Sequence, residues 1–217
     1  MRRVRHGVNG ARLTLYEWII ECYAPYVLVR CARFTNSHRQ AREIGVYTLI
    51  TTCLLAGELD RLGQLGILVD FMADVIGPDV ALRREPPVLW DDEPLIADER
   101  MRDLADALNL LARPAREVLI LHHLAAVEPA ELAQLLHYPA VDIAPKINRA
   151  ESLLAESLTN LHANAEAPAH LDVRPLLADF AAALDTAWLQ EVAACAIRYL
   201  ARHESHPTRP PGPCHLN

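Results

Sequence analysis

Few residues in this sequence of 217 amino acids have the types and spacing that catalysis needs. Asp70 and Asp74 are one helical turn apart, a spacing that paired catalytic carboxylates can have. No partner base, glycine-rich loop or metal-ligand cluster accompanies them, so we interpret them as part of a solvated helix face. The sequence also has no nucleophile–base pair and no cofactor loop, and it predicts a protein that is not an enzyme and holds no cofactor.

The possible metal ligands are also poorly arranged. His122 and His123 are adjacent, and neighbours on a helix point about 100° apart, so we expect one to pack, the other to be exposed, and no shared metal ion. The five cysteines form no CxxC pair, which favours reduced thiols in a cytoplasmic protein. Four more candidates near the C-terminus fit no structural-zinc spacing: His203, His206, Cys214 and His215. We predict no metal site.

Charge and hydropathy exclude two further classes of protein. The chain has 28 Asp+Glu against 21 Lys+Arg and a formal charge of −7, so it lacks the overall positive charge of a nonspecific nucleic-acid binder. Any DNA binding must therefore be local. No apolar run approaches the ~20 residues of a membrane span, and the basic N-terminus is not followed by a signal-peptide core. We expect a cytoplasmic protein without membrane insertion.

An acidic, proline-rich segment divides the sequence. Residues 85–94 contain three prolines and four acidic residues and cannot continue a helix. We therefore predict an all-α fold with two helical domains joined by a linker, since no convincing strand is found. The predicted boundaries are residues 11–84 for the first domain, 85–98 for the linker, 99–162 for the second domain, 163–205 for a C-terminal helical extension and 206–217 for a disordered tail.

Hydrophobic periodicity near 3.6 residues predicts the helices within these segments. Three are expected before the linker, at about residues 13–32, 40–55 and 62–75. Three short helices follow it, at about 99–111, 115–124 and 129–137. Asp142 is a candidate N-cap for the next helix, with Pro145 in the first turn and an apolar stripe that continues to Leu161. A single last helix is expected over about residues 173–203.

Residues 115–162 therefore have the order of a helix-turn-helix. A short first helix with Ala133 at the crossing allows the next helix to approach closely, and that second helix can place its N-terminal side chains in a major groove. On this model Lys146 and Arg149 point away from the apolar positions Ile143 and Ile147.

This region resembles region 4, the C-terminal DNA-binding region, of sigma-70 factors of the extracytoplasmic-function type. The matching positions are Pro114, Arg116, Glu117, Val118, Leu121, Glu131, Leu132, Ala133, Arg149, Ala150 and Leu154. The resemblance implies promoter DNA as a partner and a recognition helix whose DNA-binding residues are Asp142, Lys146, Asn148 and Arg149.

The N-terminal half resembles region 2 of the same family more weakly. Residues 15–27 look like its opening helix, residues 39–43 correspond to its "A-E-D" stretch, and residues 79–84 look like its closing "D-x-x-R-R". The resemblance implies DNA contacts at Arg83 and Arg84. It also implies core RNA polymerase and an anti-sigma protein as partners, with polymerase-binding residues Arg39, Arg42, Glu43 and Tyr47.

Two departures from the family keep a second interpretation open. Arg42 stands where the family has an acid, and Asp70 and Asp74 lie on the helix that would hold the melted strand, where carboxylates repel phosphate. The leading interpretation is a sigma-like transcription initiation factor. The alternative is a sigma mimic that binds an anti-sigma factor or another regulator without opening promoters. The C-terminal extension, with Phe180 and Trp188 on its apolar face, is expected to dock over the region 4-like helices or to offer that face to a partner.

Overall fold

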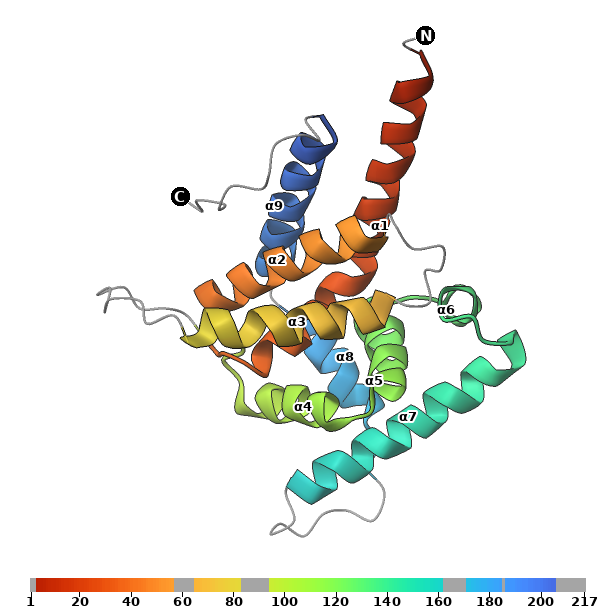
Figure 1. Cartoon of the computed structure of the whole chain (residues 1–217). Helices are drawn as coiled ribbons and strands as arrows, with labels where there is room; N and C mark the ends of the chain where they lie inside the picture. The colour runs from red at the N-terminus through yellow and green to blue at the C-terminus, as the bar shows by residue number, and fades with distance from the viewer. Residues whose placement is uncertain (1–2, 57–64, 83–93, 162–170, 185, 206–217) are drawn as a thin grey trace.

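A computed structural model of the chain describes residues 3–56, 65–82, 94–161, 171–184 and 186–205 (Figure 1). Within these ranges the regular structure is helical, apart from one isolated β-bridge between Ser37 and Pro94. The predicted all-α class is therefore confirmed. The predicted tail over 206–217 lies outside the described residues.

The N-terminal half forms three helices: α1 (Arg3–Ala32), α2 (His38–Ala56) and α3 (Leu65–Leu82). The loop before α2 is closed by side chains, because Ser37 Oγ accepts a hydrogen bond from Gln40 N at 3.1 Å, as an N-cap residue does. Helix α1 begins ten residues earlier than predicted, and α3 continues through Pro78 to Leu82.

The second half begins with α4 (Glu99–Leu110), whose N-cap Asp98 accepts hydrogen bonds from the next turn. It continues through α5 (Arg113–Leu119), a wide π-type turn η2 (Ile120–Leu124), α6 (Pro129–Leu135) and α7 (Ala140–Leu161). The predicted role of Asp142 as the N-cap of α7 is wrong. The helix begins at Ala140, so Asp142 lies in its first turn and Pro145 lies inside the helix. Negative charge near the helix N-terminus still makes Asp142 favourable there.

The turn between α6 and α7 is a Schellman motif. Tyr138 N donates to Ala133 O at 2.9 Å, and His137 N donates to Gln134 O at 3.3 Å. His137 has the left-handed φ of 55° that this motif places just after a helix. A tight connection of this kind sets α7 directly after α6, as the helix-turn-helix order requires.

A second left-handed residue, Ala126, closes the turn after η2 with a φ of 53°. We expect Ala126→Gly to raise the free energy of unfolding by about 0.5–1 kcal/mol, because glycine adopts this conformation without the clash that a Cβ brings. Urea unfolding monitored by circular dichroism measures the change. Ala144→Gly, inside α7, is the control and should lower stability by about 1 kcal/mol. If Ala126→Gly lowers the free energy of unfolding, the left-handed backbone at Ala126 is not strained by its Cβ.

The C-terminal extension forms two helices, α8 (Arg174–Ala183) and α9 (Thr186–Ser205), so the prediction of one helix is wrong. Leu184 has an extended ψ of 127°, which ends α8. The sequence signal for a break is Asp185–Thr186, two residue types that favour helix N-caps. No single described helix is long and apolar enough to cross a membrane, and only α8 and α9 together, across a bend of 64°, reach that length and composition.

The two halves pack on each other rather than lying apart. In Figure 1, α4 and α5 lie beside α1 and α3, and buried residues from both halves belong to one hydrophobic cluster. The last residues of the predicted linker pack on the loop between α1 and α2, where Leu95 is buried and its N donates to Asn36 O at 2.7 Å, whereas residues 85–93 lie outside the described part of the chain. Separate cores were expected and one shared core is observed. Whether the predicted segments also fold independently stays a prediction.

The C-terminal helices cover both halves. Helix α8 packs against η2, whereas α9 packs against α1 and α2 (Figure 1). The extension was expected to dock over the region 4-like helices or to offer its apolar face to a partner. Helix α8 docks on that half through η2, whereas the apolar face of α9 packs on α1 and α2.

Candidate functional site

Helix α7 presents the predicted recognition residues on its outer face. Ile143 and Ile147 are buried, whereas Asp142, Asn148 and Arg149 are exposed. The predicted outward direction of Arg149 is therefore confirmed. This face is formed because the apolar residues of α7 repeat at helical spacing and pack on α4, α5 and α6.

Lys146 is partly buried, because its ammonium group lies over an aromatic ring. Its Nζ is 4.1 Å from the centroid of Tyr138, which belongs to the turn before α7. A cation over a ring face is stabilised electrostatically, so the Lys146 side chain is held at the start of the helix.

A cation on α8, which the sequence reasoning missed, contacts α7 on the side of Asn148 and Glu151. Arg174 is 61% exposed, and it donates to Asn148 Oδ1 at 3.3 Å and to both carboxylate oxygens of Glu151 at 3.0–3.1 Å. Glu151 is buried, and its carboxylate compensates the charge of Arg174. No local pattern could reveal this contact, since Arg174 lies 23 positions from Glu151.

The two adjacent histidines are both half-buried, so the expectation that one is exposed is wrong. His122 Nδ1 lies 3.0 Å from Val127 O, and His123 Nε2 lies 3.1 Å from Glu151 Oε1. Burial lowers the pKa of His123, despite the neighbouring carboxylate. Each ring nitrogen named here has a protein partner, and this arrangement is structural.

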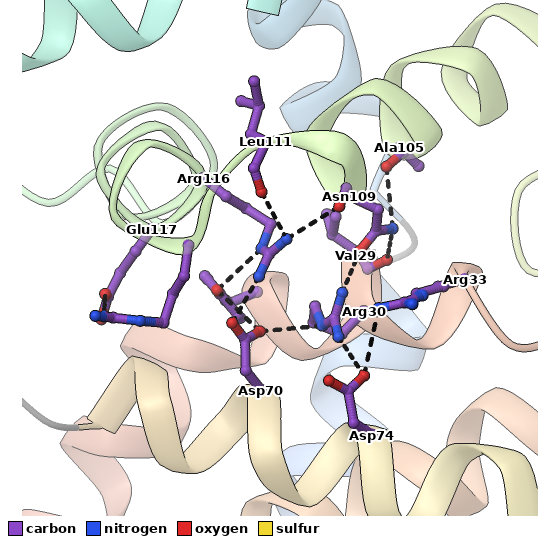
Figure 2. A network of polar contacts seen from close by, with 12 residues as sticks. Val29, Arg30, Arg33, Asp70, Asp74, Ala105, Asn109, Leu111, Arg116 and Glu117 are labelled. Carbon is purple, nitrogen blue, oxygen red and sulfur yellow. Dashed lines mark hydrogen bonds and ion pairs between the residues drawn. The ribbon is translucent and has the colours of Figure 1, made fainter. Parts of the chain in front are cut away.

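The carboxylates of Asp70 and Asp74 both bind arginines (Figure 2). Asp70 is 15% exposed, and its oxygens lie 2.6 Å from Arg116 Nη2 and 3.0 Å from Arg30 Nε. Asp74 is half-exposed and pairs with Arg30 and, at 3.5 Å, with Arg33. The interpretation of a solvated face is therefore wrong for Asp70.

These ion pairs join the two halves of the protein. Arg116, on α5, also donates to Tyr26 Oη at 3.0 Å and to the carbonyl oxygens of Asn109 and Leu111 at 3.1 Å. Arg30, on α1, donates to Asn109 Oδ1 at 2.9 Å. Figure 2 shows the resulting network, which links α1, α3, α4 and α5 through buried side chains. Buried charges are tolerated only where they are paired in this way.

Glu117 forms a second buried contact between the halves. Tyr23 Oη donates to its Oε1 at 2.9 Å, and Arg113 Nη1 donates to its Oε2 at 2.9 Å. Gly66 of α3 makes room for it, because a Cβ at Gly66 would lie 2.1 Å from Glu117 Oε1. Burial raises the pKa of Glu117 above its ordinary value, although Tyr23 and Arg113 favour the ionised form.

This raised pKa predicts a pH-dependent effect of Glu117→Gln. A carboxyl whose pKa is raised on folding contributes its full stability below the unfolded-state pKa, and that contribution is lost as the pH rises through the folded-state pKa. Glutamine does not titrate. The free energy of unfolding of Glu117→Gln, relative to wild type, should therefore be higher at pH 7 than at pH 4, as urea unfolding at both values measures. The opposite trend would mean that the Arg113 pair outweighs burial.

The predicted polymerase-binding residues lie together on α2 and are unequally accessible. Arg39 is exposed, and Glu43 and Tyr47 are partly buried. Arg42 is 24% exposed, and its Nη2 lies 2.9 Å from Glu191 Oε1 of α9. Helix α9 therefore contacts the surface that was expected to bind polymerase. The predicted DNA contacts Arg83 and Arg84 lie outside the described residues.

Potential metal ligands are scattered among the described residues. No group of three or more His, Cys, Asp or Glu side chains that could hold a metal ion is found among them, and Cys214 and His215 of the tail lie outside the described part of the chain. No family model, curated protein or solved structure matches the sequence. Function is therefore inferred from the residues described above.

Proposed function

We propose that the protein is a sigma-like transcription initiation factor that binds core RNA polymerase and directs it to promoter DNA. The observation that supports this most is the outer face of α7. It follows a tight turn and presents Lys146 and Arg149. Cations in the first half of an exposed helix that follows such a turn can contact DNA in the major groove.

The paired state of Asp70 supports the factor over the mimic. Its charge is compensated by Arg30 and Arg116, so it would repel a DNA strand less than its sequence position suggests. The exposed face of the same helix includes Phe71, at 60% exposure, with Ile67 and Val75 on either side. An exposed aromatic ring can stack on an unpaired base. A polymerase-bound protein of this kind acts in the cytoplasm, is not an enzyme, and by its family resemblance has an anti-sigma partner.

The packing of the two halves on each other favours the second candidate, a sigma mimic. The region 2-like and region 4-like halves share one core and are joined by the Arg30–Asp70–Arg116 pairs. A protein that touches two separate promoter elements must separate these halves, whereas a mimic binding a regulator need not.

Weak, salt-sensitive DNA binding by the isolated protein is expected from the charge of α7. Lys146 and Arg149 on the outer face of α7 can neutralise about two phosphates, so log affinity should fall with log salt concentration with a slope of about −2. Fluorescence anisotropy with a labelled DNA duplex, titrated at several salt concentrations, measures the slope. Tight binding or a much steeper slope would reveal a basic surface elsewhere on the protein.

The direct test uses the full-length chain with purified core RNA polymerase. A pull-down, followed by run-off transcription on genomic fragments, should give polymerase binding and specific transcripts. The protein is instead a sigma mimic if it binds polymerase weakly or not at all, gives no transcript and captures an anti-sigma protein.

A further inference from the structure

Helix α9 is held against α1 and α2 by one continuous apolar stripe. Trp188, Val192, Ala196 and Leu200 recur every four residues, and each is 0% exposed. Figure 1 shows α9 lying next to α2 and the upper part of α1. The helix therefore buries a surface of the region 2-like half, although it is joined to the chain through α8, which packs on η2.

The contact with α2 is close at one position. A Cβ at Gly45 would lie 3.0 Å from Trp188 Cη2 and 3.4 Å from Val192 Cγ1, so the indole ring rests directly against the helix backbone. One turn earlier, Arg42 pairs with Glu191 at 2.9 Å. The ring and the ion pair together define where α9 sits.

The surface of α2 is more polar than a permanent core needs. Arg42 Nε and the hydroxyl oxygens of Thr48 and Thr52 are buried without a hydrogen-bond partner. Thr48 and Thr52 lie three and seven residues after Gly45, which places them on the side of the helix that faces α9. Buried polar groups without partners are rare in proteins because they cost free energy, so a partner that offers them hydrogen bonds can compete with α9 for this face.

We propose that α9 is an intramolecular cover, which occupies the face of α2 that binds core RNA polymerase and is displaced when polymerase binds. The proposal rests on the proposed function, since it concerns the same polymerase-binding residues. Arg42 connects the two states, because its ion pair with Glu191 must break before polymerase can contact this face of α2. The covered face fits a partner that also offers hydrogen-bonding groups to Thr48 and Thr52.

Amide hydrogen exchange of the wild-type full-length chain, with and without core RNA polymerase, tests the displacement. The amides of residues 190–203 should exchange at least about tenfold faster in the complex, because they leave a packed surface. Unchanged protection of α9 in the polymerase-bound protein would overturn the cover and leave the proposed function standing.

Two variants on α9 test competition. Glu191→Arg places a second guanidinium against Arg42, and Gln190→Arg adds a positive charge at the neighbouring exposed position as the control. Loosening α9 should tighten polymerase binding by about tenfold for Glu191→Arg, since less of the protein is in the covered state, whereas the control stays within about twofold of wild type. Surface-immobilised polymerase in an optical binding assay measures the affinities.

Hydrogen exchange on each free variant shows whether α9 has loosened. If α9 stays protected in Glu191→Arg, the variant Trp188→Ala, which removes the anchoring ring, is used in its place. Thermal unfolding then checks that the rest of the protein is folded. A loosened α9 with unchanged polymerase affinity would overturn the cover alone. Absence of binding by wild type and by a loosened variant would overturn the proposed function, and the cover with it.

Discussion

Replacing Lys146 and Arg149 together by alanine should lower promoter-directed transcription by about one to three orders of magnitude, since base contacts of this kind contribute ~1–3 kcal/mol each. The two side chains are three residues apart in the first half of α7, at its seventh and tenth residues, and lie toward its outer face. Run-off transcription with core polymerase measures the effect. Neither residue belongs to the buried stripe of α7, so the fold should change little.

The stability of this double variant needs its own measurement, because Lys146 also contacts Tyr138. Loss of that cation–π contact should cost about 0.5–1 kcal/mol in the free energy of unfolding, far too little to unfold a protein of this size. Arg100→Ala combined with Arg102→Ala removes the same charge from the exposed face of α4 and is the control. It should transcribe within about twofold of wild type, because long-range effects of exposed charges are screened by salt.

Two results would contradict the assignment of α7. Full transcription by the Lys146/Arg149 double variant would mean that α7 is not the recognition helix. An equal loss in both double variants would mean that total charge matters rather than the position of these cations.

Replacing Asp70 by asparagine should lower the free energy of unfolding by about 3 kcal/mol, at the lower end of the range for breaking a buried ion pair. Arg116 and Arg30 are 6% and 1% exposed, and Asp70 lies within 3.0 Å of both. Asparagine has nearly the same shape but no charge, so Arg116 loses its carboxylate and stays buried. Urea unfolding monitored by circular dichroism measures the loss.

The control for Asp70 is Glu156→Gln, which removes a charge from the exposed side of α7. Its effect should stay within about 0.5 kcal/mol, as for most surface changes. If Asp70→Asn lowers the free energy of unfolding by less than about 1 kcal/mol, its ion pairs are no stronger than surface pairs. That result would contradict the conclusion that they join the two halves. The same variant measured in the polymerase pull-down shows whether loosening the halves favours the complex.

Local structure was largely predictable from the sequence. The apolar residues of α7 and the boundaries of α2 and α4 follow from periodicity, because side chains three or four residues apart share one helix face wherever the helix packs. Helix ends were less predictable. Asp142 and Ala140 both suit the first turn of α7, and the actual start is set by the turn geometry at His137.

The candidate site also has features that depend on nearby residues and features that depend on residues far apart in the sequence. By itself, the sequence determined the all-α class, the helix-turn-helix order and the exposed position of Arg149 on α7, since each depends on neighbours within a few residues. Tertiary structure alone decided that Asp70 is neutralised, because Arg30 and Arg116 lie 40 and 46 positions away along the chain. It also decided that α9 covers α2, because an apolar helix face specifies burial but not the surface that buries it.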